Sequence, residues 1–328
     1  MRALITGGGG FVGLAVVRML VARGVECGVV GRSHYPPLEQ LGVTVFRGDI
    51  RDKQFLVRVF KGYDTVFHVA AKAGIWGPRQ EYEAVNVGGT ANVIDACRAN
   101  RVRNLVYTGT PSVVFNHNDI DGGNESLPYG ESFLCHYAES KAWAEQLVLA
   151  ANSASLLTCA LRPHLIWGPG DPHLIPRLLD RGRRRLLRRV GDGTNLVDIS
   201  YIDNVAEAHL LAVDNLISSA TAAGNAYFIS QGKPVKLWDW INDLFRRLDI
   251  PPVETAVSFR TAYTVGGVLE WIYRLGRISS EPRMTRFLAE QLARSHWFSI
   301  ARAREDFGFQ PRISTDEGVE RLVAQLKQ

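Results

Sequence analysis

The sequence predicts an α/β protein with a doubly wound parallel sheet and a smaller, mostly helical C-terminal domain. In the first half of the chain, short runs rich in β-branched residues alternate with amphipathic stretches of helical length. Such alternation is typical of a parallel sheet covered by helices on both faces. After residue 163 the alternation ends and the pattern becomes mostly helical, which indicates a second domain.

The individual elements follow from their local patterns. We expect strands at 2–6, 26–30, 43–48, 65–70, 104–109 and 157–162, with crossover helices at 11–23, 52–60, 81–99 and 137–152. After a turn at 168–172, strands at 196–200 and 226–230, with a helix at about 203–216 between them, are expected to rejoin the sheet. The sheet domain is therefore predicted to comprise 1–165 and 196–231, and the second domain 166–195 and 232–328. The second domain should cover the carboxyl ends of the strands, where open α/β sheets bind ligands.

Composition restricts the class of protein. The chain has 328 residues, of which 46% are hydrophobic and 22% charged, as in a folded globular protein. No uncharged apolar run reaches the roughly 18 to 20 residues that span a bilayer. The first strand leaves no room for a signal peptide before it, so we expect a cytoplasmic protein. The four cysteines lie far apart without metal-site spacing, so we expect reduced thiols and no metal.

A basic run at residues 177–189 contains seven arginines in a chain of net charge +5. The simplest interpretation is a solvated face, and the alternative is peripheral contact with a membrane or an anionic carrier. The run lacks the interleaved aromatic residues of nucleic-acid-binding segments. We therefore expect no nucleic-acid partner.

A glycine-rich stretch, "ITGGGGFVG" at 5–13, connects the first strand to the first helix. Gly7 allows the tight turn, Gly10 allows the backbone to approach a pyrophosphate, and Gly13 allows close packing of helix on strand. Phe11 and Val12 open the helix, whose N-terminal N–H groups favour an anion. The stretch predicts a Rossmann-type dinucleotide site, so the sheet domain would bind the cofactor and the second domain the substrate.

The end of the second strand indicates which dinucleotide binds. An NAD-type unit usually carries Asp or Glu there, whereas this chain reads "VVGRS". Arg32 and Ser33 would suit the 2′-phosphate of NADP(H), so we predict a preference for NADP(H), with NAD(H) as the alternative. Further cofactor contacts are expected from residues that follow the third and fourth strands: Asp49, Ile50, Ala70 and Ala71.

Tyr137 and Lys141 are four residues apart in a helical stretch, and no other tyrosine of the ten has a lysine at this spacing. The spacing places both on one helical face. A tyrosine of pKa about 10 exchanges protons slowly near neutral pH, and a nearby ammonium would lower that pKa. The pair thus predicts a proton donor.

Taken together, these stretches resemble the extended short-chain dehydrogenase/reductases. The matching motifs run in order along nearly the whole chain: "TGGGGFVG", "GDI", "HVAA", "NVGGT", "VYTGTPSVVF", "YAESK", "RPHLIWGPGD" and "YIDNVAEAH". The resemblance implies that Tyr137 donates the proton, that Lys141 also holds the nicotinamide ribose, and that Pro163 packs against the nicotinamide. Thr110 aligns with the catalytic hydroxyl and Ser112 is its alternative, although strand alternation places Thr108 on the same face.

Within that family, "GTPSVVF" and the segment 281–322 are similar to the 3β-hydroxysteroid dehydrogenase group, and most similar to reductases of 2-alkyl-3-oxoalkanoates and 3-dehydrogenases of sterol-4α-carboxylates. The implied reaction is hydride transfer at C3 of a hydrophobic β-keto or β-hydroxy acid, or of a 3-oxo- or 3-hydroxysteroid. Lys72 and His164 are the candidates for binding a carboxylate. A homodimer is implied as well. The alternatives are a sugar-nucleotide epimerase or dehydratase and a non-catalytic cofactor-binding scaffold.

Overall fold

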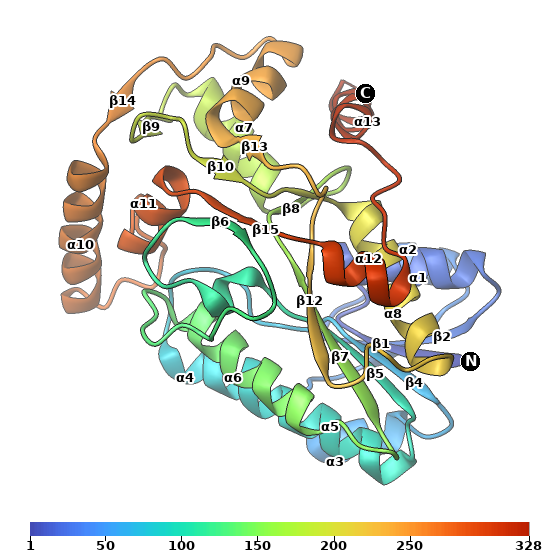
Figure 1. Cartoon of the computed structure of the whole chain (residues 1–328). Helices are drawn as coiled ribbons and strands as arrows, with labels where there is room; N and C mark the ends of the chain where they lie inside the picture. The colour runs from blue at the N-terminus through green and yellow to red at the C-terminus, as the bar shows by residue number, and fades with distance from the viewer. Residues whose placement is uncertain (328) are drawn as a thin grey trace.

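The computed structural model describes residues 1–327 and is built around a seven-stranded parallel sheet (Figure 1). The strand order is β12-β7-β5-β4-β1-β2-β3, and every neighbouring pair is parallel. The predicted doubly wound sheet is confirmed. The order reverses between β1 and β4, and ligands of such sheets bind at this point, beyond the carboxyl ends of the strands. The strands are β1 (Arg2–Thr6), β2 (Glu26–Gly31), β3 (Thr44–Arg47), β4 (Thr65–His68), β5 (Asn104–Thr108), β7 (Leu157–Pro163) and β12 (Asn225–Ile229).

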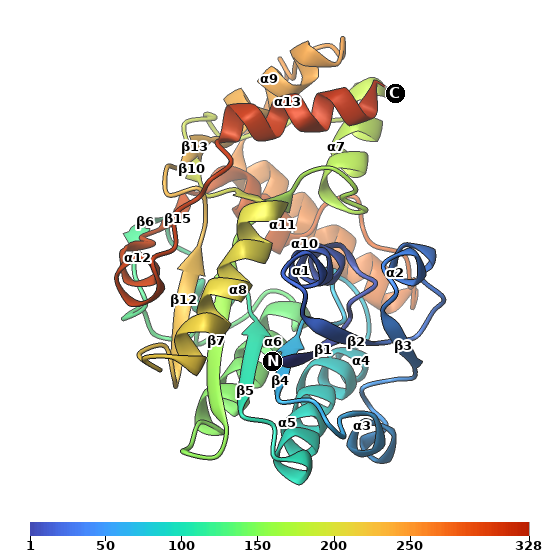
Figure 2. The ribbon, with the colours of Figure 1, turned by 90° about the vertical axis from the view of Figure 1, so that its right-hand side faces the viewer.

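Helices cover both faces of this sheet (Figure 2). The apolar side chains of α1, α8 and α12 form one core with the sheet, and those of α3, α5 and α6 form another. The central strands β4 and β5 are buried along their full length, which explains their continuous apolar sequences. The helices are α1 (Phe11–Ala22), α2 (Pro36–Gln40), α3 (Lys53–Val59), α5 (Gly89–Asn100), α6 (His136–Ala150), α8 (Ile202–Ile217) and α12 (Ala301–Phe307).

The helix predicted at 81–99 is longer than expected and irregular. It consists of α4 (Arg79–Tyr82), a π-helical segment η1 (Glu83–Gly88) and α5. Such π segments within helices are frequent at functional sites. Its importance here is that it carries Asn86, a residue of the candidate site.

A second, mostly helical region lies over one end of the sheet and has its own core, which includes Trp167, Trp238 and Trp240. Its helices are α7 (Leu174–Arg183), α9 (Leu237–Arg247), α10 (Phe259–Leu275), α11 (Arg286–Ala293) and α13 (Thr315–Leu326). Its short strands, and those that join it to the sheet, are β6 (Ile120–Gly123), β8 (Ile166–Trp167), β9 (Arg189–Val190), β10 (Leu196–Val197), β11 (Ser200–Tyr201), β13 (Val235–Lys236), β14 (Ala256–Val257) and β15 (His296–Phe298).

The expectation that 196–200 rejoins the main sheet is wrong. β10 belongs to a four-stranded sheet with β13, β15 and β6, and β11 pairs with β8. The reason is visible at Ser200, whose hydroxyl donates to the carbonyl oxygens of His164 (2.7 Å) and Ile229 (3.0 Å). The Ser200 side chain therefore connects this segment to the main sheet, in place of the backbone hydrogen bonds that a further strand would form. The strand expected at 226–230 is confirmed as β12, while the exact domain boundaries stay a prediction.

No helix within residues 1–327 combines the length and the apolar character needed to cross a bilayer.

Candidate active site

The glycine turn after β1 is shaped for a dinucleotide, because Gly7 and Gly13 carry no side chain at two points where backbone segments lie very close together. Gly7 has a φ of +71°, and a Cβ on it would lie 2.8 Å from the backbone of Ala70. A Cβ on Gly13 would lie 2.2 Å from the carbonyl oxygen of Gly7. The N–H of Gly10 donates to that same oxygen at 2.9 Å and closes the turn. The helix α1 therefore starts directly against the end of β1.

The first turn of α1 can accept an anion. Gly10 is its N-cap, and within residues 1–327 no side chain caps it. The N–H groups of Phe11 and Val12 are among the donors that an α-helix leaves without an intrahelical acceptor. These donors and the positive end of the helix dipole suit a pyrophosphate.

The end of β2 presents the predicted NADP determinants to solvent. Arg32 and Ser33 follow β2 directly, and both are exposed. Beside them lies an aromatic ring that sequence reasoning missed, because Tyr35 shows no motif. Cβ atoms on Gly9 and Gly31 would lie 2.1 and 2.5 Å from this ring, so it packs on the glycine turn.

Asp49 and Ile50 follow β3 as expected. Asp49 accepts from the backbone N–H of Arg51 at 2.9 Å and from its guanidinium at 3.0 and 2.8 Å. These bonds hold the pKa of the Asp49 carboxyl below its usual range. Ile50 is buried, and its side chain fills the space beside Gly89. Arg51 thus already occupies the Asp49 carboxylate, and the adenine amine of a bound dinucleotide would have to share this acceptor with Arg51.

The segment after β4 is fixed to α6 through Asn86. The Asn86 amide accepts from the Lys72 N–H at 2.7 Å, donates to the Lys72 carbonyl at 3.1 Å and donates to the Ser140 hydroxyl at 2.9 Å. Ala70, whose N–H lies 3.3 Å from the Thr6 hydroxyl, is held beside Gly7, and Ala71 follows it. The residues expected to line the cofactor are therefore held rigidly.

Tyr137 lies in the first turn of α6, and the Thr110 hydroxyl lies near enough to its phenol to oppose the rise in the Tyr137 pKa. The Thr110 hydroxyl also donates to the Ser112 hydroxyl at 3.2 Å. The hydroxyl of Thr108 instead faces the buried His209, 2.8 Å from its Nε2. Of the three hydroxyls that sequence left open, the structure thus joins Thr110 to Tyr137, with Ser112 behind it.

Lys141 is only 2% exposed, and its ammonium donates to the Thr108 carbonyl at 2.6 Å. It also lies 4.1 Å from the ring centroid of Tyr107. Burial lowers the pKa of Lys141 to about 7, although the nearby Glu145 opposes the shift. Burial raises the pKa of Tyr137 to about 12, with a smaller contribution from Cys135. The expectation that Lys141 lowers the tyrosine pKa is therefore not met, and Tyr137 holds its proton firmly.

A buried ion pair behind Lys141 was not anticipated. The Arg162 guanidinium donates to the Glu145 carboxylate at 2.6 Å, and the Tyr129 hydroxyl donates to it at 2.9 Å. Glu145 follows Lys141 by one helical turn, so the Tyr-x₃-Lys-x₃-Glu spacing was the available signal. A Cβ on Gly109 would lie 2.6 Å from this carboxylate, so the ion pair leaves no room for a side chain at position 109.

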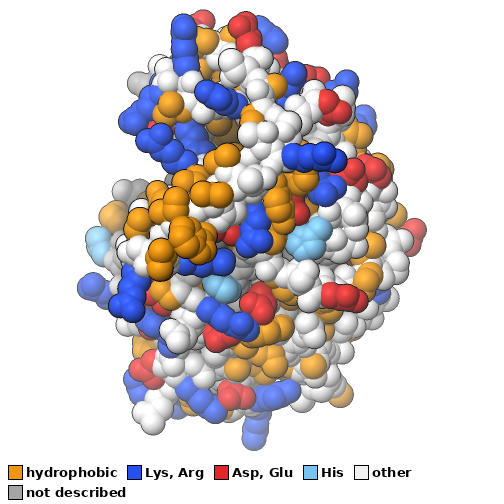
Figure 3. Space-filling view, turned by 90° about the vertical axis from the view of Figure 1, so that its left-hand side faces the viewer, with side chains coloured by type: hydrophobic (Ala, Val, Ile, Leu, Met, Phe, Trp, Pro, Cys, Tyr) orange, Lys and Arg blue, Asp and Glu red, His pale blue; other side chains and the backbone are white. Residues whose placement is uncertain are grey.

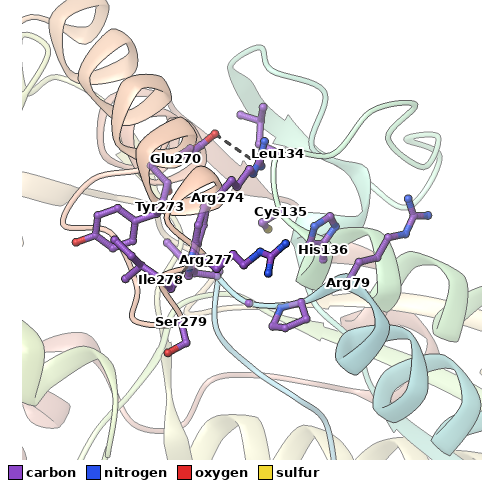
Figure 4. Close-up of a pocket in the computed structure, with 15 residues that line it drawn as sticks. Arg79, Leu134, Cys135, His136, Glu270, Tyr273, Arg274, Arg277, Ile278 and Ser279 are labelled. Atoms are coloured by element: carbon purple, nitrogen blue, oxygen red, sulfur yellow. Dashed lines mark hydrogen bonds and ion pairs between the residues drawn. The ribbon is translucent and has the colours of Figure 1, made fainter.

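A cavity of about 420 Å³ lies beside the first turn of α6 (Figure 4). Its walls come from the loop after β4, from Leu134, Cys135 and His136, and from the C-terminal end of α10 with the residues that follow. Most of the wall is apolar, and the volume lies within the range of small-molecule pockets, about 300 to 1,000 Å³. Cys135 and His136, the two residues before Tyr137, line this cavity, whereas Tyr137, Lys141 and Thr110 do not, so the cavity lies next to the buried catalytic residues without including them.

Arginines supply the positive charge of this pocket. Arg79 pairs with Glu83 at 2.6 Å and with Glu139 at 3.2 Å. Arg274 lies 3.9 Å from Glu270, which is buried and paired with Arg286 at 2.9 Å. Arg277, in contrast, has no carboxylate within ion-pair distance among residues 1–327, and it extends across the pocket toward His136.

The remaining predicted residues, Lys72, Pro163 and His164, do not line the pocket. Lys72 forms an ion pair with Glu81 at 2.6 Å. Pro163 is the last residue of β7, and His164 after it is buried against His296, with ring centroids 4.8 Å apart. Burial holds the pKa of His164 well below its usual value, so this imidazole is neutral. Neither candidate is thus a free cation.

Comparison with known proteins agrees with this geometry. Residues 4–259 match the 3-beta hydroxysteroid dehydrogenase/isomerase family. The chain is 51% identical over 326 residues to a 2-alkyl-3-oxoalkanoate reductase of Stenotrophomonas maltophilia, covering 99% of both chains. It is 32% identical to the mouse sterol-4-alpha-carboxylate 3-dehydrogenase (decarboxylating), covering 98% of this chain and 90% of that one.

Solved structures show the same fold. The crystal structure of gox2253 has a TM-score of 0.82 at 28% identity, covering 100% of this chain and 98% of that one. MoeE5 in complex with UDP-glucose and NAD has a TM-score of 0.75 at 25% identity, covering 100% and 99%. The chain is an NAD(P)-dependent oxidoreductase that acts on CH–OH groups, and it belongs to the 3-beta hydroxysteroid dehydrogenase/isomerase family.

Proposed function

We propose that this protein reduces the C3 ketone of a hydrophobic 2-alkyl-3-oxo acid, with NADPH as the second substrate. The observation that carries the proposal is the mainly apolar pocket next to the first turn of α6, the turn that contains Tyr137. Of its arginines, Arg79 and Arg274 lie near carboxylates, whereas Arg277 has none within ion-pair distance among residues 1–327. A hydrocarbon chain suits the apolar wall, and a carboxylate suits the guanidinium. The similarity to a 2-alkyl-3-oxoalkanoate reductase supports this substrate class.

The acid–base chemistry belongs to Tyr137. Bound NADPH supplies hydride to the carbonyl carbon, and the oxygen then needs a proton. Because burial raises the pKa of Tyr137 to about 12, the phenol is protonated at neutral pH and can donate to an alkoxide, which is far more basic. The Thr110 hydroxyl, which acts on the same phenol, is proposed to hold the ketone oxygen beside it.

Arg277 replaces Lys72 and His164 as the proposed partner of the substrate carboxylate. Lys72 is neutralised by Glu81, and the His164 ring is uncharged. Arg277 has a φ of +49°, unusual for a residue other than glycine. This conformation ends α10 in a Schellman motif, in which the Ile278 N–H donates to the Tyr273 carbonyl at 2.9 Å, and the Arg277 side chain extends across the pocket.

The proposed preference for NADPH is supported by the end of β2. No carboxylate follows that strand to bind a ribose 2′-hydroxyl, whereas Arg32 and Ser33 are exposed and available for a 2′-phosphate. Lys141 is proposed to hold the nicotinamide ribose, and Pro163 to pack on the nicotinamide ring. NAD(H) remains the alternative cofactor, since MoeE5 was solved with NAD.

Two further proposals concern assembly and location. The four cysteines are buried and unpaired, as in a reducing compartment, which supports a cytoplasmic location. A homodimer is supported by the large apolar side chains of Trp143 and Leu147, which α6 leaves exposed. Light scattering after gel filtration would measure the oligomeric state, and a monomer at micromolar concentration would contradict the dimer.

Turnover with a panel of substrates tests the function. Because 3-oxo acids lose CO₂ spontaneously, the reaction is best followed in reverse, as NADP⁺ reduction by 2-alkyl-3-hydroxy acids. We expect turnover of these acids, slower turnover of 3β-hydroxysteroids that lack a carboxylate, and no turnover of UDP-glucose. Turnover of the nucleotide sugar, or of steroids alone, would contradict it.

A further inference from the structure

Helix α10 exposes an apolar face that nothing in the described chain covers. Twelve large hydrophobic side chains are exposed in the structure, and six of them lie between residues 265 and 278. Trp271 and Leu275 are the most exposed, at 65% and 71%. We call this set the α10 stripe, which consists of Val265, Val268, Trp271, Ile272, Leu275 and Ile278.

The spacing and the view from outside agree that the stripe is one surface. Residues 265, 268, 272 and 275 recur at intervals of three and four, which places them on one side of the helix. Figure 3 looks onto this side of the molecule, where hydrophobic side chains gather and Lys and Arg side chains lie above and below them. A contiguous apolar surface of this kind usually marks an interaction site.

The opposite side of α10 is firmly packed, so the exposure is not a sign of a detached helix. A Cβ on Gly266 would lie 2.6 Å from the backbone of Thr285. Glu270 is buried and accepts from the Arg286 backbone N–H at 2.7 Å and from its guanidinium at 3.0 Å. The fold thus holds α10 rigidly with the stripe outward.

Positive charge surrounds the stripe. Arg260 and Arg283 lie exposed at its two ends. The basic run 177–189 lies alongside, because Arg177 pairs with Glu281 just after α10 and β9 pairs with β14 just before it. In that run Arg183, Arg184, Arg185 and Arg188 are exposed. The one acidic residue between 256 and 280 is Glu270, which is buried.

We propose that α10 docks on the surface of an anionic lipid bilayer, with the stripe at the boundary of headgroups and acyl chains and the arginines at the phosphates. An amphipathic helix with Trp and Leu on one side and cations around it is typical of such interfacial binding. A second protein chain would also cover the stripe, but the run 177–189 has five exposed arginines against one exposed acid, Asp180, which pairs with Arg184 at 2.9 Å, and this excess of positive charge favours a uniformly negative surface. Tyr273, Arg277 and Ile278 of the same segment line the proposed substrate pocket, so this pocket lies next to the docked lipid.

Vesicle sedimentation with the full chain tests this proposal. Vesicles of phosphatidylcholine with phosphatidylglycerol should bind the protein at low salt at least about tenfold more strongly than phosphatidylcholine alone, and added salt should weaken the binding. The double variant Trp271→Gln/Leu275→Gln should bind at least about tenfold more weakly, because two large apolar groups are lost from the interface. Neither residue lines the pocket, so turnover of a short water-soluble substrate should persist and show that the variant is folded.

Two further variants make the test specific. Ile217→Gln/Leu326→Gln replaces exposed apolar residues of α8 and α13 and should leave vesicle binding unchanged. Arg184→Glu/Arg188→Glu should weaken binding to the anionic vesicles alone. Absence of wild-type binding at low salt, equal binding to both vesicle types, or full binding by the Trp271→Gln/Leu275→Gln variant would each overturn the proposal. Self-association of the wild type that this variant abolishes, without vesicle binding, would identify a second copy as the occupant.

Discussion

Substitution of Arg277 tests the orientation of the substrate most directly. Arg277→Met keeps an unbranched side chain in place of the aliphatic part of arginine and removes the charge. A hydrogen bond between charged groups contributes about 1.5 to 3 kcal/mol, equivalent to roughly ten- to a hundredfold in affinity. Arg277 is exposed, and solvent screening weakens exposed ion pairs. We therefore expect the lower end, a loss of about tenfold in kcat/KM for a 2-alkyl-3-hydroxy acid.

The methyl ester of the same substrate separates this effect from a general loss of activity. The ester has no charge for Arg277 to bind, so the variant and the wild type should oxidise it equally well. Arg277→Lys should recover part of the activity on the acid. Arg274→Met is the matched control, because Arg274 lies in the same pocket but stacks on Trp76 and faces Glu270. If Arg277→Met lowered kcat/KM equally for the acid and the ester, the proposed contact between Arg277 and the substrate carboxylate would be refuted. The proposed reaction itself would still stand.

Three other predictions concern the catalytic and cofactor residues. Tyr137→Phe should lower kcat by about 10² to 10⁴-fold and leave the Kd of NADPH nearly unchanged. Lys141→Ala should impair both turnover and NADPH binding. A Tyr137→Phe variant that kept most of its activity would remove Tyr137 from the mechanism. Arg32→Ala should weaken NADPH binding by about tenfold or more and leave NADH binding unchanged, as measured by fluorescence titration, and an unaltered preference would refute the assignment. If turnover needs the Lys141 ammonium, the rate should fall as pH rises through the lysine pKa, and Glu145→Gln should move this fall to lower pH, because the carboxylate raises that pKa. An unmoved pH profile in a folded Glu145→Gln variant, assayed well below its melting temperature, would contradict this role of Glu145.

The fold was predictable because its signals are local. Glycines at fixed spacing, β-branched runs and amphipathic helices specify the sheet and its winding without knowledge of distant contacts. The prediction for 196–200 was wrong because a five-residue strand pattern does not show which sheet the strand joins. Its place depends on Ser200, which reaches the ends of β7 and β12 through its side chain, and no sequence pattern encodes that contact.

The candidate site was predictable where it rests on a motif and unpredictable where it rests on tertiary pairing. Tyr137, Lys141 and Thr110 lie together as expected. Lys72 and His164 were chosen because they follow strand ends, but their charge depends on Glu81 and on burial against His296, both distant in sequence. Arg277 was missed because nothing in the sequence shows that it lacks an acidic partner. One arginine among many becomes distinctive only when the fold leaves it unpaired beside an apolar pocket.

The buried Glu145–Arg162 pair connects these observations. Removing one partner of a buried pair typically costs about 3 to 5 kcal/mol, because the other charge is left uncompensated. The pair therefore constrains its neighbours: it leaves no room for a side chain at Gly109, and its carboxylate opposes the loss of the Lys141 proton. With position 109 closed to a side chain, the hydroxyl that acts on the Tyr137 phenol is that of Thr110. We thus expect Gly109→Ser to destabilise the fold by about 1 to 3 kcal/mol through overpacking, without supplying a second catalytic hydroxyl. A Gly109→Ser variant that kept its full thermal stability and rescued turnover in Thr110→Val would show that position 109 can hold the ketone oxygen after all.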